Sequence, residues 1–188
     1  MNYEYMTDRL VLKILDASYA QNALQFFTEN RDIFEPFEPS KPENFYTYNY
    51  QRSLMTCEYQ MALKLNFIRF WVFLKEDPDT VIGTVSYQNF FKTPYQKCQT
   101  GYRFDRRYWH NGYATEALDF ANRIIFRELS IHRIEAYVMP ENQLSIRLLE
   151  RLNFIREGFC RSCINICGRW TDHYLYALLS EDINSLHQ

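Results

Sequence analysis

The stretch Arg106–Ala117 reads Arg-Arg-Tyr-Trp-His-Asn-Gly-Tyr-Ala-Thr-Glu-Ala and follows a strand-like segment, Thr100–Phe104. A turn that passes directly from a strand into a helix leaves the first backbone N–H groups of the helix without partners. These groups, with the positive end of the helix dipole, can bind a phosphate or pyrophosphate without a basic side chain. Gly112 and Ala114 are small enough to let a ligand reach the backbone. The stretch therefore predicts an anion site, with an ordinary strand-to-helix turn as the alternative.

The segment after this turn keeps its apolar residues on one face: Ala117, Leu118, Ala121, Ile124 and Ile125. This pattern is typical of a half-buried helix, here from Thr115 to about Glu128. The turn is neither a Walker loop nor a dinucleotide fingerprint, because both require further glycines.

The rest of the chain alternates between extended and helical patterns. We expect strands at 7–15, 67–76, 80–91, 100–104, 132–138, 154–166 and 170–179, and helices at 17–29, 43–65, 115–128 and 143–151. The strands between 67 and 104 are joined by short turns, one of them at Asp77-Pro78-Asp79, and predict an antiparallel meander. The sequence thus predicts one domain over residues 1–188, of the mixed α/β (α+β) class, with about six to seven strands and four main helices.

Three local signals refine these elements. Asp16 and Asn142 are the expected N-caps of the helices at 17–29 and 143–151. Pro42 is expected in the first turn of the helix at 43–65. Pro36 and Pro39 predict a loop over 34–40, either a lip of a substrate cleft or an ordinary connection.

The composition excludes several classes of protein. Hydrophobic residues make up 47% of the chain and aromatic residues 18%, which excludes long disordered stretches. A net charge of −2 gives no electrostatic reason to expect a nucleic-acid partner. The first residues contain no apolar leader and no apolar run is long enough to span a bilayer, so we expect a cytoplasmic protein with no membrane partner.

The cysteines do not form a recognisable framework. There are five, an odd number, and their spacing is not that of a secreted disulfide scaffold. If 154–166 is a regular strand, Cys160 and Cys163 point to opposite faces and cannot share an ion. We therefore expect no metal site.

The stretch around Gly112 resembles the acetyl-coenzyme A pyrophosphate loop of the GCN5-related N-acetyltransferases (GNAT). That loop begins with Arg or Gln, then two residues, Gly, one residue, and Gly or Ala; Trp109 stands at the first place, and Gly112 and Ala114 at the last two. Further motifs are similar to the RimJ/RimL-type branch, which acetylates ribosomal-protein N-termini: Thr-Asp-Arg-Leu-Val-Leu-Lys at 7–13, His-Arg-Ile-Glu-Ala at 132–136, Met-Pro-Glu-Asn at 139–142, Leu-Leu-Glu-Arg-Leu-Asn-Phe at 148–154 and Gly-Arg-Trp-Thr-Asp-His at 168–173. The likeness covers nearly the whole chain.

The resemblance implies where the cofactor, acetyl-CoA, binds. In this fold two neighbouring parallel strands splay apart and hold the pantetheine arm, here 100–104 and 132–138. The residues implied in cofactor binding are Phe104, Trp109, His110, Asn111, Gly112, Tyr113, Ala114, Thr115 and Asn142. Asn142 would contact the arm, and Ser145 would face the sulfur as general acid. The alternatives are a helix cap for Asn142 and a hydroxyl bonded only to the backbone for Ser145.

The sequence gives less specific signals for the residues that bind the acceptor substrate. Phe37 and Glu38 are candidates on the expected lip, and Tyr87 is a candidate aromatic wall, although such rings more often belong to a core. His173 could be a general base, but packing within the last hairpin is the preferred interpretation. Glu116 is interpreted as a first-turn helix acid rather than a catalyst.

Three departures from the family leave the general base unassigned. Leu149 replaces a Tyr proton donor, Gln99 replaces a strand Glu, and residues 159–166 contain no carboxylate. At pH 7 an α-amine with a pKa of about 7.7 to 8.0 is roughly a tenth neutral, whereas a lysine is neutral in about one molecule in two thousand. A site without a base therefore suits an N-terminal amine.

These observations predict an acetyl-CoA-dependent N-acetyltransferase whose acceptor is a primary amine, in particular a protein or peptide N-terminus, attacked directly in a ternary complex. One alternative is acetylation of a small amine such as a polyamine or an aminoglycoside. The other is a non-catalytic acyl-CoA-binding module. The sequence leaves open whether the protein is a monomer or a homodimer.

Overall fold

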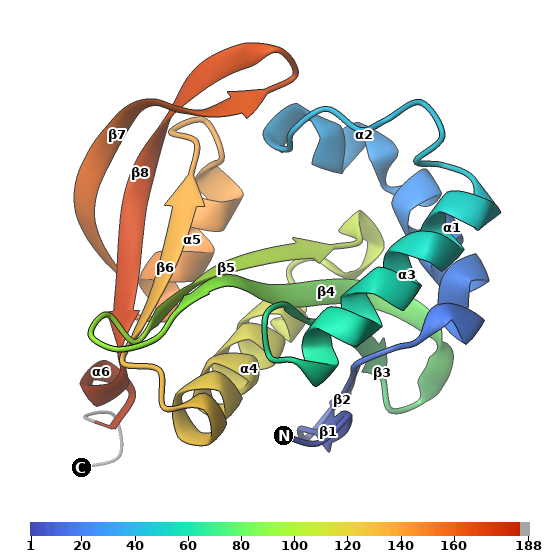
Figure 1. The fold of residues 1–188 in the computed structure, drawn as a ribbon, viewed down its shortest axis with the longest axis horizontal. Helices are drawn as coiled ribbons and strands as arrows, with labels where there is room; N and C mark the ends of the chain where they lie inside the picture. The colour runs from blue at the N-terminus through green and yellow to red at the C-terminus, as the bar shows by residue number, and fades with distance from the viewer. Residues whose placement is uncertain (185–188) are drawn as a thin grey trace.

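A computed structural model describes residues 1–184, which contain one mixed sheet of eight strands in the order β1-β2-β3-β4-β5-β6-β8-β7 (Figure 1). The strands are β1 (Glu4–Met6), β2 (Leu10–Lys13), β3 (Ile68–Leu74), β4 (Asp77–Phe91), β5 (Lys97–Phe104), β6 (Arg133–Val138), β7 (Ile155–Ile166) and β8 (Arg169–Leu179). The helices are α1 (Ala20–Glu29), α2 (Arg31–Phe34), α3 (Tyr48–Leu63), α4 (Tyr113–Leu129), α5 (Gln143–Arg151) and α6 (Ser180–Asn184), with 3-10 turns η1 (Ala17–Tyr19), η2 (Glu35–Phe37) and η3 (Arg106–Tyr108). The expected mixed α/β class and antiparallel meander are confirmed.

Helices cover both faces of the sheet, because strand side chains alternate between the two. In β3, Phe70 and Val72 pack with the buried residues of α4 and α5, whereas Trp71 and Phe73 pack with those of α1 and α3. Figure 1 shows α1 and α3 on one side of the strands and α4 on the other. The two faces are called here the α4 face and the α3 face.

The parallel strands β5 and β6 separate soon after they meet. They are paired only over Lys97–Gln99 and Arg133–Glu135, and beyond these residues they diverge (Figure 1). Residues 100–104 still pair with β4, and 136–138 still pair with β8, so each strand is held from its outer side. The gap leaves one backbone edge of each strand without a strand partner, as the resemblance implied.

Several expected boundaries were wrong. The first segment is a hairpin of β1 and β2, and the turn expected at 77–79 lies at 75–76, so Asp77 already begins β4. Helix α3 begins at Tyr48 rather than at 43, because Thr47 caps it by accepting a hydrogen bond from the Tyr50 N–H. Asp16 caps η1, as expected, and the helix after it begins with that 3-10 turn.

The segment 34–40 is also more ordered than expected. It contains the end of α2 and the turn η2, in which Pro36 occupies an early position that needs no N–H donor. The sheet has one strand more than the upper expectation, and α2 and α6 are short helices that the sequence patterns did not reveal. Residues 185–188 of the expected single domain lie outside the described part of the chain.

The expectation that Cys160 and Cys163 face opposite sides of the sheet was wrong. Strand β7 contains a bulge between Cys160 and Ile164, with Ser162 at a φ of 46°, and a bulge interrupts side-chain alternation. Cys160 is the cross-strand partner of His173, and the Cys163 thiol lies 3.6 Å from the His173 Nδ1, so both cysteines adjoin one ring. Within residues 1–184, no three His, Cys, Asp or Glu side chains are grouped as a metal site would require.

None of the helices in this same range combines the length and the apolar character that crossing a membrane requires.

Candidate active site

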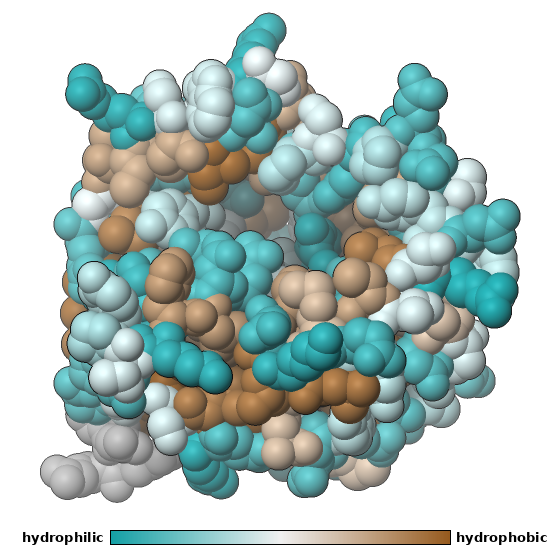
Figure 2. All heavy atoms as spheres, viewed as in Figure 1, coloured by the Kyte–Doolittle hydropathy of each residue, from teal (hydrophilic) through white to brown (hydrophobic). Residues whose placement is uncertain are grey.

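A cavity of about 610 Å³ lies where β5 and β6 separate. Its rim is formed by α2 and η2 on one side and by β7 on the other, and Figure 2 shows the hollow between these segments. The tip of the β7–β8 hairpin touches the opposite rim, because the Cys167 thiol lies 3.5 Å from the Glu35 carbonyl oxygen. The cavity is therefore bounded by segments that lie far apart in the sequence.

The cavity opens to both faces of the sheet. On the α4 face it is lined by Tyr102 and Phe104 of β5, by residues 112–115 and by Ser145 and Leu148 of α5. On the α3 face it is lined by Arg69, Ser86, Gly101 and Arg103, the strand positions that alternate with the first set. The first part is called here the cofactor half and the second the acceptor half.

The loop before α4 has the geometry of an anion site. Gly112 has a φ of 81°, in the left-handed region, and occupies the N-cap position without a capping side chain. The Glu116 N–H donates to the Gly112 carbonyl, so the N–H groups of residues 113–115 lie in the first turn and have no intrahelical acceptor. Gly112, Tyr113, Ala114 and Thr115 all line the cavity. His110 and Trp109 line it beside them, and His110 also has a positive φ, 64°.

Two side chains fix this loop. The Trp109 indole N–H donates to the Phe104 carbonyl oxygen at 2.8 Å, which ties the loop to the end of β5. Arg9 donates to the Asn111 carbonyl oxygen at 2.9 Å and lies over the Tyr113 ring, 4.7 Å from its centroid. The Asn111 side chain does not line the cavity, because its amide donates to the Trp109 carbonyl oxygen.

Glu116 anchors Arg9 to α4. Its carboxylate accepts hydrogen bonds from the Arg9 backbone N–H at 3.0 Å, from the Arg9 Nε at 2.7 Å and from the Thr7 hydroxyl at 2.5 Å. Burial opposes ionisation of this carboxyl, but these hydrogen bonds and the Arg9 charge lower its pKa overall. Glu116 is thus a structural acid in the first turn, and Arg9 connects the strand motif at 7–13 to the loop.

Asn142 and Ser145 lie together at the start of α5. The Asn142 side-chain oxygen accepts a hydrogen bond from the Ser145 N–H at 3.1 Å, which is the predicted cap. The Ser145 Oγ lies 2.6 Å from the hydroxyl of Tyr102, which projects from β5 across the gap between the strands. Burial raises the pKa of Tyr102 well above its usual value near 10, so this phenol stays protonated at neutral pH.

The acceptor half contains the expected lip residues in a different role. Phe37 and Glu38 both line the cavity, and Glu38 forms ion pairs with Arg103 and with Lys41. Burial would raise the pKa of Glu38, but the two cations hold it below its usual value. Glu38 is therefore a neutralised carboxylate and not a free anion awaiting a cation.

Two other candidates lie outside the cavity. Tyr87 is wholly buried on the α4 face, where its hydroxyl donates to the Asn122 side-chain oxygen at 2.6 Å, so it belongs to the core. His173 is 3% exposed, its Nδ1 lies 3.3 Å from the Thr171 carbonyl oxygen, and burial lowers its pKa. The Asp172 carboxylate accepts from the Ser162 N–H, so these residues stabilise the last hairpin.

Within residues 1–184, the acceptor half holds no evident general base; His110, whose imidazole also lines the cavity, belongs to the loop before α4. Gln99 and Gln88, both neutral amides, lie beside the gap between the strands, and Leu149 is buried in the core. Among the residues that the structure describes, Glu38 is the sole carboxylate lining the cavity, and its charge is already paired.

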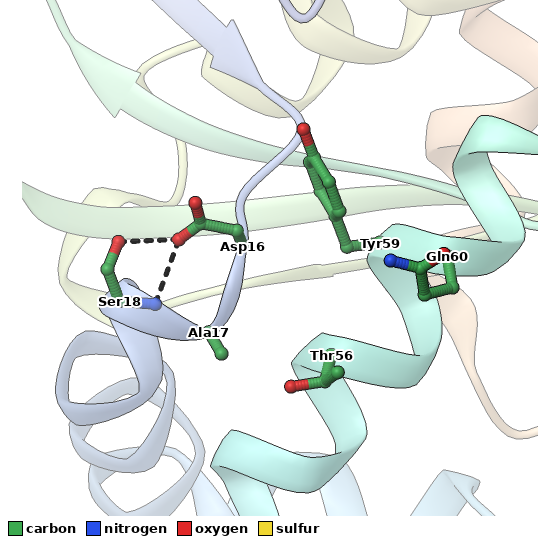
Figure 3. Close-up of a pocket in the computed structure, with 6 residues that line it drawn as sticks. All are labelled: Asp16, Ala17, Ser18, Thr56, Tyr59 and Gln60. Carbon is green, nitrogen blue, oxygen red and sulfur yellow. Dashed lines mark hydrogen bonds between the residues drawn. The ribbon is translucent and has the colours of Figure 1, made fainter.

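A second hollow, of about 320 Å³, lies between η1 and α3 (Figure 3). Asp16, its one ionisable acid, accepts hydrogen bonds from the Ser18 N–H and hydroxyl, and the other lining side chains include Thr56, Tyr59 and Gln60. The Asp16 carboxylate serves here as the N-cap of η1, and the residues that line this hollow include none from the loop before α4.

Sequence reasoning missed three contributors to the site: Tyr102, Arg9 and the pair Arg69 and Arg103. For Tyr102 a signal existed, since it alternates with Gly101 and Arg103 and so shares a face with Phe104. Arg9 stands in the motif at 7–13, which indicates a strand and a likeness to the RimJ/RimL-type branch but carries no local sign of a contact with the loop. The arginines lie on strands that carry no local sign of a shared surface.

Comparisons with known proteins agree with this geometry. A family model described as an acetyltransferase (GNAT) domain matches residues 9–155. "Probable N-acetyltransferase YjcK" from Bacillus subtilis is 37% identical over 92% of this chain and 95% of its own length. "[Ribosomal protein uS5]-alanine N-acetyltransferase" from Escherichia coli is 33% identical over 94% of this chain and 90% of its own length.

A solved structure extends the likeness to three dimensions. The ribosomal-protein-S5-alanine acetyltransferase from Vibrio fischeri superposes with a TM-score of 0.89 at 26% identity, covering 96% of this chain and 98% of that one. The chain belongs to the GNAT family of N-acetyltransferases, and its relatives include the RimJ/RimL-type enzymes.

Proposed function

We propose that the protein uses acetyl-CoA to acetylate the α-amine at the N-terminus of a protein or peptide, by direct attack in a ternary complex. The observation that carries this proposal is the cavity that passes between β5 and β6 and opens to both faces of the sheet. Such a cavity lets a thioester enter from one face and an amine from the other. The uS5-alanine enzyme among the relatives supports an N-terminal acceptor.

The cofactor half fits acetyl-CoA. The pyrophosphate would accept hydrogen bonds from the N–H groups of residues 113–115, where the helix dipole also favours negative charge. Arg9, whose Nη2 lies 3.4 Å from the position of a Cβ on Gly112, would add a positive charge beside it. The pantetheine arm would bind the open edge of β5, with Asn142 at the end of the arm.

Ser145 is placed to act as the general acid. When the amine nitrogen bonds to the acetyl carbon and the carbon–sulfur bond breaks, the departing thiolate needs a proton. Tyr102 can donate its hydrogen bond to the Ser145 Oγ at 2.6 Å, which leaves the serine proton free to point toward the sulfur. A backbone N–H on the open edge of β5 would stabilise the developing oxyanion.

The missing base favours an α-amine as acceptor. At pH 7 an α-amine is neutral in roughly a tenth of molecules, which water alone can maintain, whereas a lysine is neutral in about one in two thousand. The acceptor half also lacks a free carboxylate among its described residues, because Glu38 is paired with Arg103 and Lys41. A polycation such as a polyamine therefore finds no complementary charge there.

The test is release of free thiol from acetyl-CoA in the presence of N-terminal peptides, polyamines and aminoglycosides, with titration calorimetry for acetyl-CoA alongside. We expect tight cofactor binding and release that depends on a peptide with a free α-amine. Release with polyamines or aminoglycosides alone would replace the proposed acceptor class by small amines. Tight binding with no release from any acceptor would favour a non-catalytic acyl-CoA-binding module.

A further inference from the structure

The acceptor half carries two guanidinium groups side by side. Arg69 of β3 and Arg103 of β5 both line the cavity, and their Cζ atoms lie 6.0 and 5.7 Å from the centroid of the same ring, Phe27. Arg69 also lies 5.3 Å from the centroid of Phe67 and is held among aromatic rings. The two cations are therefore fixed on the α3 face next to the place proposed for the acceptor amine.

Carboxylates offset only part of this charge. Arg69 pairs with Glu58 at 3.1 Å, while Arg103 and Lys41 share Glu38. The cluster thus combines three cations with two acids, which leaves a surplus of one positive charge. Glu58 and Lys41 do not line the cavity, so an acceptor meets Arg69, Arg103 and Glu38, which keep the same surplus of one positive charge.

Arg69 also has an unsatisfied donor. Its side chain is 10% exposed, and its Nε is a buried donor with no hydrogen-bond partner. Leaving such a donor unpaired carries a free-energy cost. A charged acceptor group bound here would recover part of that cost.

Resting on the proposed function, we infer that the acceptor peptide carries an acidic side chain close to its N-terminus, which binds to Arg69 and Arg103. A carboxylate matches the paired donors of a guanidinium and neutralises the surplus positive charge. A basic side chain at the same place would be repelled. The protein would therefore select acidic N-termini over neutral and basic ones.

The strand register sets the position of that acidic residue. Arg69 pairs with Ser86, and Ser86 pairs with Gly101, so the three lie in one row across β3, β4 and β5. Neighbouring strands are about 4.8 Å apart, so Arg69 lies roughly 10 Å from the strand edge at Gly101. An extended peptide advances about 3.3 to 3.6 Å per residue, so the second or third residue, with its side chain, spans this distance.

The test compares kcat/KM for matched peptides that differ only in Glu, Gln or Lys at residue two, and in a second series at residue three. The variant is Arg69→Gln combined with Glu58→Gln, which removes both charges of the buried pair and leaves neither unpaired. Arg127→Gln, an exposed charge on α4 and on the other face of the sheet, is the matched control. The preference is the ratio of the kcat/KM values of two peptides measured with the same protein, so a general loss of activity does not change it.

We expect the wild type and the control to prefer Glu over Gln about tenfold at one of the two positions, and to disfavour Lys. In the double variant the preference should fall below about threefold. Equal turnover of Glu, Gln and Lys peptides by the wild type, or an undiminished preference in the double variant, overturns this inference and leaves the proposed function standing. If no peptide is acetylated at all, the proposed function fails, and this inference fails with it.

Discussion

The two halves of the cavity differ in the groups that they offer to a ligand. The cofactor half relies on backbone N–H groups at the start of α4, held by one short loop, 105–115. The acceptor half relies on charged side chains from β3, β5 and the segment after η2, with Glu38, Arg69 and Arg103 far apart in sequence. A backbone site is sensitive to any added Cβ and insensitive to most side-chain changes. A side-chain site can change its preference with one charge.

The largest effect should follow the substitution Gly112→Asp. It adds a negative charge beside the proposed pyrophosphate and places a residue with a Cβ at a φ of 81°. We expect the affinity for acetyl-CoA to fall at least 100-fold by titration calorimetry. Gly168→Asp is the control, because Gly168 has the same φ of 81° but lies in the β7–β8 turn with open space around it. If both variants lose the same affinity for acetyl-CoA, backbone strain alone explains the loss, and the loop is not the anion site.

The next largest effect should come from Ser145→Ala. Loss of a general acid lowers kcat by about 100-fold, with little change in acetyl-CoA affinity, because the Ser145 N–H still donates to Asn142. The measurement is steady-state thiol release with a peptide acceptor at saturating acetyl-CoA. An unchanged kcat would remove Ser145 as the acid and leave the anion site intact.

Tyr102→Phe should have a smaller effect, about tenfold on kcat, because it removes the partner of Ser145 and not the acid itself. Combined with Ser145→Ala it should cost no more than Ser145→Ala alone, since both changes interrupt one hydrogen-bonded pair. Tyr176→Phe is the control, because it removes another buried phenol, one that is bonded to Glu150 at 3.1 Å and does not line the cavity. Additive losses would indicate that Tyr102 acts independently.

The smallest effect concerns stability and comes from Glu116→Gln. The pKa of Glu116 is below its usual 4.5 in the folded protein, so its charge stabilises the fold above about pH 4.5 and this contribution is lost as the pH falls through the folded-state pKa. Because the pair with Arg9 is partly exposed, we expect about 1 kcal/mol, or roughly 2 to 4 °C in Tm, at pH 7. The difference between variant and wild type should shrink as the pH falls below 4.5 and through the folded-state pKa. A constant difference at all pH values would show that shape, not charge, matters here.

The contrast between local backbone features and long-range side-chain contacts also explains which features the sequence predicted. The loop at Gly112, the cap at Asn142 and the stripe of α4 depend on neighbouring residues, so local patterns revealed them. The bulge in β7 gave no local signal, and it reversed the facing expected for Cys163. Helix α3 began five residues late because Thr47 offered a better cap than the start at Pro42.

The acceptor half could not be read in this way. Glu38 was a candidate substrate residue on the expected lip, but its pairing with Arg103 depends on the strand register and on the path of η2, which no local pattern fixes. Tyr87 was a candidate for the cleft wall, but the alternation of β4 turns it to the α4 face. Long-range packing, and not residue type, decides which side chains meet in this half.

Because the described residues of the acceptor half include no free general base, we expect the protein to acetylate an α-amine in preference to a lysine. The most direct measurement is mass-spectrometric mapping of the acetyl group on a peptide that carries both a free N-terminus and one internal lysine, at pH 7. The account predicts acetylation at the N-terminus in roughly 200-fold excess, the ratio of the neutral fractions of the two amines. Acetylation of the lysine at a comparable rate, or of a peptide whose N-terminus is blocked, would contradict it.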